Sequence, residues 1–488
     1  MRRLALALAL CLSCHGGSSA YSDAAARCQA PRSGTDAFTG KAFPDQKGSL
    51  NDEKTWLKGF MSDLYLWYRE IPSVDASKYT AMDAYFQALK TPQKTATGKL
   101  KDAFSFTLGT AEWEALSQSG VEAGYGATFA LVSRSPPRKA VVAYTEPNTP
   151  ATSAPASLTR GVEILNVDGA AVVDGNKDVL NAGLFPTDTN PHTFTVLDHG
   201  TQRTFSMTPA SILSVPVKNV GFLPNNPGVG YILFNAHIGT AEKGLVDAIT
   251  QLKGATDLVL DMRYNGGGYL VLASELAYMI AGPGKTAGAY FEKTVFNDKY
   301  TANDPVTGRT LAPTPFYTQT VGLSETAGQA LPHLDLNRVF ILTGSGTCSA
   351  SESVINGLIG AGVTVNLFGK NTCGKPYGFY PQDNCGTTYF AIEFQGLNAQ
   401  GFGDYADGFV PGGGGPAGPP GCLVNDDFTH DLGDPAEARL AAALQFRSGG
   451  ACPPAPASRA ETAAAGPAGD EDVTLVRNPV LEMRWMVR

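Results

Sequence analysis

The stretch Ile-Leu-Thr-Gly-Ser-Gly-Thr-Cys-Ser-Ala-Ser-Glu-Ser, residues 341–353, connects an apolar run to a helical pattern. The run Arg338–Thr343 predicts a buried strand, because it is short, apolar and closed by two glycines. The apolar residues that follow lie at helical spacing, so Ser349 is predicted to lie at a strand-to-helix turn. A serine in this place would have an exposed hydroxyl, and the N–H groups of the first helical turn could stabilise an oxyanion.

A structural role is the alternative for this serine. The pattern Ser349-x-x-Glu352 also matches a capping box, in which the serine side chain binds the backbone N–H of the glutamate and the glutamate side chain reciprocates. Capping is the more common role for these two residue types before an apolar run. The choice between a cap and a nucleophile therefore depends on the rest of the chain.

Two further strands are predicted to end beside this turn. Val363–Phe368 is a second buried strand, and Lys375 follows it in a loop. Asp257–Asp261 is a third, and three consecutive glycines come soon after it. The alternation of strands and helices predicts a mainly parallel sheet with crossover helices. Such a sheet would bring a serine, a lysine and a glycine-rich turn to one edge.

These motifs resemble those of the carboxyl-terminal processing (tail-specific) serine peptidases, which use a Ser/Lys dyad. The resemblance spans roughly residues 116–445. It implies that Ser349 is the nucleophile and Lys375 the general base. It also implies that the N–H groups of Ala350 and Gly267 form the oxyanion hole. The motifs are Asp-Met-Arg-Tyr-Asn-Gly-Gly-Gly at 261–268, Thr-Cys-Ser-Ala-Ser-Glu at 347–352, Phe-Gly-Lys-Asn-Thr-Cys-Gly-Lys at 368–375 and Val-Gly-Tyr-Ile-Leu-Phe at 229–234.

The chain departs from this family at two points. The serine and the lysine are 26 residues apart, one more than the family spacing. The family places a glutamine four residues after the lysine, whereas this chain has Phe379 there and Gln382 nearby at another spacing. What orients Lys375 is therefore left open. A lysine acts as a base only when neutral, so its pKa must fall from a free value near 10.4, as burial in an apolar cleft can achieve.

The resemblance implies an α/β fold with a mainly parallel sheet of the crotonase or Clp-protease type. A PDZ-like β-rich domain and a small N-terminal helical module, built on an aromatic stripe, would precede it. Gly124, Tyr125 and Gly126 fall where PDZ domains hold the carboxylate-binding loop, in which successive N–H groups can receive a terminal carboxylate. The expected divisions are a signal segment 1–20, helical module 21–115, PDZ-like domain 116–214, peptidase domain 215–447, and linker and tail 448–488.

Composition limits the other classes of protein. A net charge of −8 without a basic cluster argues against nucleic-acid binding, and the scattered histidines and cysteines predict neither a metal site nor a cofactor. Residues 1–20 combine arginines, a short apolar stretch and small residues, which is typical of a secretion signal. Ser18-Ser19-Ala20 suits ordinary cleavage, whereas Leu12-Ser13-Cys14 resembles a lipoprotein box that would attach a lipid anchor to Cys14. Either alternative predicts export to a bacterial periplasm or cell envelope.

Six cysteines remain after the targeting segment, which suits an oxidising compartment. Turn-forming residues between Cys373 and Cys385 predict that the chain doubles back there and joins these two sulfurs. Such a bridge would hold the lysine on a fixed backbone. Cys348 is the rival partner for Cys373, and six cysteines allow 15 pairings, so the sequence leaves the pairing open.

Three functions fit the sequence. The first is an exported serine endopeptidase that cleaves proteins or peptides bound as extended strands and recognised by their C-termini. The second is a scaffold that has lost its chemistry and binds peptides through the PDZ-like domain; the missing glutamine favours it. The third is a Ser/His esterase or amidase, which would need His237 or His333 in the cleft. No acid at a suitable spacing supports that pair, so His237 is predicted to be a surface or loop histidine.

Overall fold

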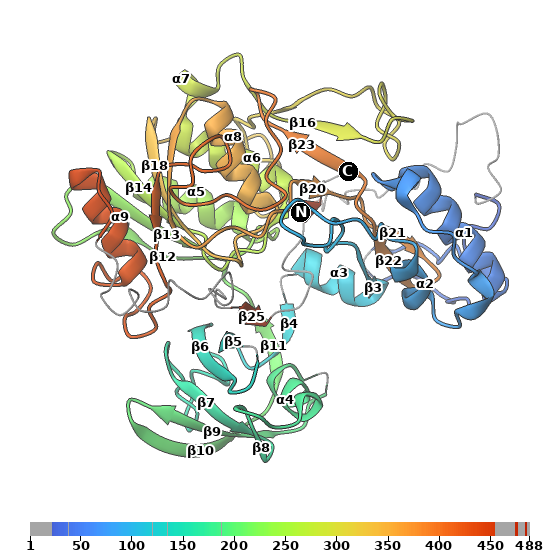
Figure 1. Cartoon of the computed structure of the whole chain (residues 1–488), viewed down its shortest axis with the longest axis horizontal. Helices are drawn as coiled ribbons and strands as arrows, with labels where there is room; N and C mark the ends of the chain where they lie inside the picture. The colour runs from blue at the N-terminus through green and yellow to red at the C-terminus, as the bar shows by residue number, and fades with distance from the viewer. Residues whose placement is uncertain are drawn as a thin grey trace.

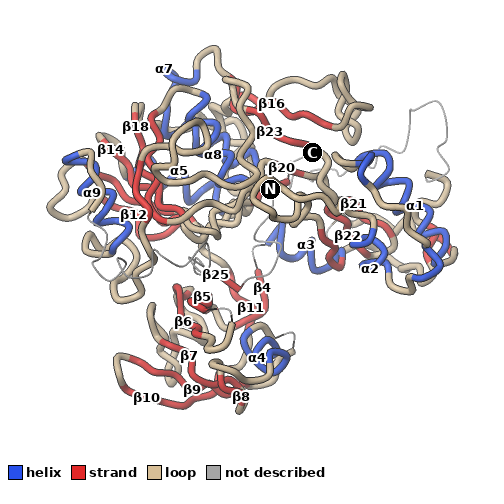
Figure 2. The backbone as a smooth tube through the Cα atoms, viewed as in Figure 1, coloured by secondary structure: helices blue, strands red, loops and turns tan. Residues whose placement is uncertain are grey.

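The computed structural model contains three packed units (Figure 1; Figure 2). A central body with a large sheet carries a β-rich unit at the bottom of the view and a unit with helices at the right. The expected signal segment and Cys14 lie outside the described residues. The structure describes residues 22–37, 39–119, 121–133, 135–186 and 188–453, and the backbone of two short strands at 474–476 and 484–485.

The central sheet has six strands, and each neighbouring pair is parallel except the first, which is antiparallel. Its strands are nearly continuous apolar runs, as expected for a sheet covered on both faces. The predicted strands before the serine turn and before the glycine turn have the predicted bounds. In spatial order the strands are β12 (Val217–Phe222), β13 (Val229–Phe234), β14 (Asp257–Asp261), β18 (Arg338–Thr343), β19 (Thr364–Gly369) and β24 (Gly421–Leu423).

Helices cover both faces of this sheet. Three helices share one apolar core with residues of one face, which include Ile232, Leu260 and Ile341. One helix and two strands of the β-rich unit cover the other face, which includes Tyr231 and Phe340. The first three helices are α5 (Ala241–Gln251), α6 (Leu270–Ala281) and α8 (Ala350–Gly360), and the helix on the opposite face is α9 (Ala438–Gly449).

The β-rich unit is an antiparallel sheet closed by one short helix, α4 (Lys177–Leu184). A ladder of two strands, β4 (Val121–Gly124) and β11 (Ala210–Leu213), lies where the chain enters and leaves it. The sheet consists of β5 (Ala127–Ser133), β6 (Lys139–Thr145), β7 (Glu163–Val167), β8 (Ala170–Ala171), β9 (His192–Asp198) and β10 (Thr201–Met207). The tail strand β25 (Thr474–Val476) pairs with β5.

The N-terminal unit is built on the predicted aromatic stripe, which is confirmed as core. Trp56 stacks on Phe60 at 5.3 Å, and both are buried with residues that follow the lysine loop, such as Tyr389. The unit contains α1 (Leu50–Leu64), α2 (Met82–Ala88), α3 (Thr110–Ser119), the 3-10 turns Tyr68–Glu70 and Ala76–Lys78, β1 (Arg27–Cys28), β2 (Gln46–Lys47), β3 (Phe106–Gly109), β21 (Gln382–Asn384) and β22 (Thr387–Phe390).

Short elements complete the central body. No helix among the described residues is long and apolar enough to cross a membrane. The remaining elements are α7 (Pro283–Thr286), β15 (Gly268–Tyr269), β16 (Tyr290–Phe296), β17 (Thr314–Pro315), β20 (Tyr377–Gly378), β23 (Phe394–Leu397) and the tail strand β26 (Arg484–Trp485), which pairs with β15.

Candidate active site

Ser349 lies in the turn between β18 and α8. The strand ends at Thr343 and the helix begins at Ala350, so the serine is the residue just before the helix. Its backbone has φ 62°, in the left-handed region that residues other than glycine rarely adopt. Strained backbone of this kind persists only where the surroundings impose it, and it is concentrated at functional sites.

The Ser349 hydroxyl is enclosed and unpaired. The residue is 0% exposed, and its Oγ has no hydrogen-bond partner among the described residues. The prediction that this hydroxyl is exposed is therefore wrong. The glutamate half of the predicted capping box is formed, because Glu352 accepts the Ser349 N–H, whereas the Ser349 Oγ has no hydrogen bond of its own. Because an unpaired buried polar group costs roughly 1–3 kcal/mol, the capping box alone does not account for this hydroxyl.

A disulfide joins the serine turn to the lysine loop. Cys348 and Cys373 are bonded, with their Cα atoms 5.1 Å apart. The predicted bridge between Cys373 and Cys385 is therefore wrong. The chain does not double back after the lysine but continues into the N-terminal unit, where Cys385 is bonded to Cys28. The third bridge, Cys422–Cys452, lies outside this turn.

Glu352 holds the same two loops by hydrogen bonds. Its Oε2 accepts the backbone N–H of Ser349 at 2.9 Å and that of Lys375 at 2.8 Å. Its Oε1 accepts the N–H of Gly374 at 2.8 Å and the hydroxyl of Thr372 at 2.5 Å. Burial raises the pKa of the Glu352 carboxyl above 4.5, and these donors act in the opposite direction. One carboxylate therefore fixes the backbone of both candidate catalytic residues.

The Lys375 side chain lies between two phenyl rings. Its Nζ is 4.7 Å from the ring centroid of Phe379 and 5.4 Å from that of Phe104, and the residue is 1% exposed. The family that this sequence resembles has a glutamine at the position of Phe379. In this chain the lysine therefore contacts an aromatic ring there instead of an amide. Phe104 comes from the N-terminal unit, and no sequence motif indicated it. The amine is therefore enclosed, with two aromatic rings at cation–π distance from its Nζ.

The glycine turn after β14 packs against the serine turn. The carbonyl of Asn265 accepts the N–H of Cys348 at 3.0 Å and the hydroxyl of Ser351 at 2.9 Å. The Asn265 side chain accepts the N–H of Gly267 at 3.0 Å, so this expected oxyanion donor is engaged within its own turn. Ala350 is the first residue of α8, and its N–H has no acceptor within the helix.

His237 is buried against the same glycine turn. It is 0% exposed, its N–H donates to the carbonyl of Gly267, and its Nδ1 lies 3.0 Å from Asn265 Oδ1. His237 does lie in a loop, between β13 and α5, but it is buried rather than on the surface, because the glycine turn packs against it. Burial lowers the pKa of His237 to about 3, so the imidazole is neutral at neutral pH. His333 pairs with Asp335 and does not contact this turn in the described chain.

The same region offers little to a metal ion. Cys348, Glu352 and Cys373 place three ligand-type atoms within 4.8 Å of one another. Both sulfurs belong to the disulfide, so neither is the thiolate that a metal would bind. This cluster of the described chain is therefore a structural bridge with a carboxylate beside it.

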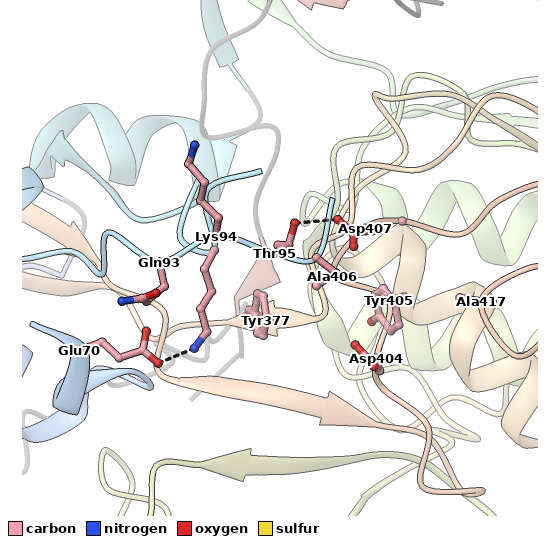
Figure 3. A pocket seen from close by; sticks show the side chains of 13 residues that line it. Glu70, Gln93, Lys94, Thr95, Tyr377, Asp404, Tyr405, Ala406, Asp407 and Ala417 are labelled. Carbon is pink, nitrogen blue, oxygen red and sulfur yellow. Dashed lines mark hydrogen bonds and ion pairs between the residues drawn. The ribbon is translucent and has the colours of Figure 1, made fainter. Parts of the chain in front are cut away.

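A cavity of about 640 Å³ adjoins the lysine loop, between the N-terminal unit and the central body (Figure 3). Tyr377, two residues after the lysine, lines it, and burial together with nearby carboxylates raises the pKa of Tyr377 to about 12. Lys101 pairs with Glu70 at 2.6 Å on one side, and Thr95 donates to Asp407 at 2.9 Å on the other. The serine and the lysine do not line this cavity.

The loop expected to bind a carboxylate leads into β5. Tyr125 is buried, and its hydroxyl donates to the carbonyl of Gly183 at 2.9 Å. Gly126 has φ 78°, and a Cβ there would lie 2.4 Å from Oγ1 of Thr149, so the position requires glycine. Gly124 ends the ladder strand β4. These contacts give the loop a fixed backbone at the start of a sheet edge.

Comparison with known proteins adds two matches to family models. Residues 228–379 match the model of Peptidase family S41, and residues 52–106 match that of the Peptidase S41 N-terminal domain. The first range contains both Ser349 and Lys375, and the second contains Phe104. No curated protein matches the chain.

Solved structures share the fold. A Bacteroides fragilis protein classed with the S41 proteases is 23% identical, with a TM-score of 0.59, and the match covers 81% of this chain and 97% of that one. The photosystem II D1 C-terminal processing protease is 19% identical, with a TM-score of 0.42 over 73% and 90% of the two chains. Mature CPAF complexed with lactacystin is 12% identical, with a TM-score of 0.38 over 74% and 92%. The first of these structures has the same fold as this chain.

Proposed function

Because the chain belongs to peptidase family S41 and is a serine peptidase, we propose that it cleaves polypeptides with Ser349 as nucleophile and Lys375 as general base. The observation that carries this assignment is the double connection between their loops. The disulfide Cys348–Cys373 and the carboxylate of Glu352 both join the serine turn to the lysine loop. Glu352 caps α8 through the Ser349 N–H, but neither its bond to the Lys375 N–H nor the disulfide belongs to a helix cap.

The reaction follows from the groups in place. Neutral Lys375 takes the proton of the Ser349 hydroxyl as Oγ attacks the peptide carbonyl carbon. The N–H of Ala350, at the positive end of α8, donates to the oxyanion that forms. When the C–N bond breaks, the protonated lysine returns the proton to the leaving amine. Water then hydrolyses the acyl-enzyme, with the lysine again as base.

The second oxyanion donor has to come from the glycine turn. The N–H of Gly267 donates to the Asn265 side chain in the resting arrangement. We assign the Gly267 N–H to the oxyanion hole. To serve there it must leave Asn265 Oδ1 and donate to the substrate carbonyl oxygen instead. An oxyanion is the stronger acceptor, because hydrogen bonds to charged oxygens are about twice as strong as neutral ones.

The substrates are proposed to be exported proteins or peptides bound as extended strands. The β-rich unit supports this, because β5 is a strand that follows a glycine loop and has only the short tail strand β25 on its outer side. Such an edge pairs with a peptide backbone, and the loop at Gly124–Gly126 would receive a terminal carboxylate. The three disulfides fit a protein that folds outside the cytoplasm. Attachment through Cys14 remains part of this proposal.

A serine-reactive fluorophosphonate probe tests the assignment. The wild-type protein should be labelled at Ser349, and the Ser349→Ala and Lys375→Ala proteins should not be. His237→Ala is the control for a Ser/His pair and should be labelled. If folded wild-type protein takes no label and cleaves no unfolded casein, the protein is a scaffold that binds peptides. If His237→Ala alone abolishes labelling, the base has been wrongly assigned.

A further inference from the structure

The chain's own C-terminal tail pairs with two strand edges. β25 (Thr474–Val476) is antiparallel to β5, with Leu475 opposite Ala130. Without β25, strand β5 would be the outermost strand of its sheet, with unpaired backbone groups. Figure 1 shows β25 where the β-rich unit meets the central body, beside β4 and β11.

The second tail strand lies at the catalytic turns. β26 (Arg484–Trp485) is parallel to β15, which begins at Gly268, directly after the glycine expected in the oxyanion hole. β26 also contacts β20, which begins two residues after Lys375. The tail backbone therefore lies against β15, which follows the glycine turn, and against β20, which follows the lysine loop. Ser349 and Lys375 are both enclosed in this arrangement.

The two pairings can be made by one extended segment. Val476 and Arg484 are eight positions apart, and a fully extended chain of that length reaches about 27 Å. The charge of the tail also differs from that of the rest of the protein. Residues 473–488 contain three arginines and one glutamate, whereas the whole chain carries −8. The tail sequence is thus opposite in net charge to the rest of the chain, whose acidic residues include Asp404 and Asp407 in the cavity that Tyr377 of β20 lines.

We propose that the edges of β5 and β15 form one two-part surface for an extended polypeptide, and that the tail occupies it in the resting protein through β25 and β26. The consequence for activity rests on the proposed peptidase function: a substrate must displace the tail before it reaches Ser349. The binding itself does not depend on that function, because strand pairing uses only backbone groups. The occupant belongs to the same chain, so its effective concentration is in the millimolar range.

Binding of a labelled peptide tests the surface without any chemistry. The probe is a fluorescent peptide with the sequence of residues 473–488, and its anisotropy is measured with Ser349→Ala protein that ends at residue 472. The full-length Ser349→Ala protein should bind the probe at least about tenfold more weakly, because its tethered tail competes. A scrambled peptide of the same composition is the control. Equal binding to both proteins, or no binding to the truncated one, overturns the proposal.

Backbone variants separate strand pairing from side-chain effects. In the full-length Ser349→Ala protein, Leu475→Pro combined with Trp485→Pro should raise probe binding toward the truncated level, because proline removes a backbone donor. Leu475→Ala combined with Trp485→Ala keeps both donors and should change binding less. If both pairs bind the probe like the unmodified full-length protein, the tail does not hold this surface through its backbone.

Cleavage kinetics then test the consequence. With Ser349 intact, truncation at residue 472 should lower KM for casein at least threefold and leave kcat within a factor of two. If the truncated protein binds the probe more tightly but has the same KM as the full-length protein, then the tail does not compete with the substrate. Tight probe binding by a truncated protein that cleaves nothing contradicts the proposed peptidase and leaves the tail surface intact, so the two failures are distinguishable.

Discussion

Cys348 is bonded to Cys373, so the residue before the proposed nucleophile Ser349 is covalently joined to the residue two positions before the proposed base Lys375. The bridge spans the strand-end turns of β18 and β19, which are neighbours in the sheet. Since the glutamine expected after the lysine is Phe379, covalent and carboxylate restraint of the lysine loop takes over part of its orienting role.

Removal of this bridge should therefore reduce catalysis more than folding. We expect Cys348→Ser/Cys373→Ser to lose roughly 3 kcal/mol of stability, since the closed loop spans 25 residues, and to lose at least tenfold in kcat. Cys422→Ser/Cys452→Ser is the matched control, because its bridge spans 30 residues outside the dyad. It should lose similar stability and keep its kcat. Equal kcat in both variants, measured below their melting temperatures, would leave the first bridge a stabilising role only.

The Glu352 carboxylate should be as important as the disulfide. Glu352→Gln replaces one acceptor oxygen by an NH₂ group, which then faces two N–H or O–H donors whichever way the amide is oriented. We expect a loss of about 1–3 kcal/mol in stability and a fall in kcat, because the backbones of Ser349 and Lys375 separate.

Glu242→Gln controls for the loss of a buried carboxylate. Glu242 accepts the N–H groups of Gly322, Ser324 and Glu325 away from the dyad. Its glutamine variant should lose stability and keep kcat, as measured by thermal unfolding and casein cleavage. A Glu352→Gln protein that cleaves like the control would show that this carboxylate does not position the dyad.

The pH dependence of kcat identifies the base. We expect kcat to rise through neutral pH into the alkaline range, because Lys375 must be neutral to take the proton. His237, with its pKa lowered to about 3, stays neutral over this range and cannot cause the rise. Ser349→Ala, Lys375→Ala and the double variant should be equally inactive, since the two residues act as a unit. A profile that is flat from about pH 6 upward would count against Lys375.

A pair of buried carboxylates should make stability depend on pH. Burial and the nearby charge of Glu242 raise the pKa of Glu275 to about 8. The folded protein then keeps a proton that the unfolded chain releases near pH 4.5, so this contribution to stability is complete below pH 4.5 and is lost as pH rises toward 8. Glu275→Gln stays neutral, and its Oε1 can still accept the N–H of Val321.

Melting temperatures of Glu275→Gln and wild type should therefore differ more at pH 9 than at pH 4.5, in favour of the variant. Differential scanning fluorimetry at both pH values measures this difference. The same offset at both would mean that Glu275 titrates normally in the folded protein.

The sequence predicted the parts of this site that depend on chain order. Strands β14 and β18 and the turn at Ser349 follow from apolar runs closed by glycine, which are local signals. Glu352 was visible as well, but its spacing indicated only a cap. Its acceptance of the Lys375 N–H depends on how β19 lies beside β18, which periodicity does not specify.

Long-range packing accounts for the wrong predictions. The pairing of Cys385 depends on the chain crossing to Cys28, and turn-forming residues cannot distinguish such a crossing from a local reversal. His237 was predicted to be a surface or loop histidine because no acid lies at a suitable spacing, and its burial depends on the glycine turn that packs against it. The enclosure of the Ser349 hydroxyl similarly depends on neighbouring segments rather than on its own.

The phenyl ring of Phe104 beside Lys375 bears on what an independent catalytic unit of this protein would be. The ring enters from a part of the chain more than a hundred residues before residue 228, where the S41 match begins. A fragment cut at that boundary would keep the nucleophile, the base and the bridge between them, but water would replace one apolar wall of the amine. The catalytic unit of this protein therefore includes the N-terminal unit, whose Phe104 forms one side of the lysine's enclosure.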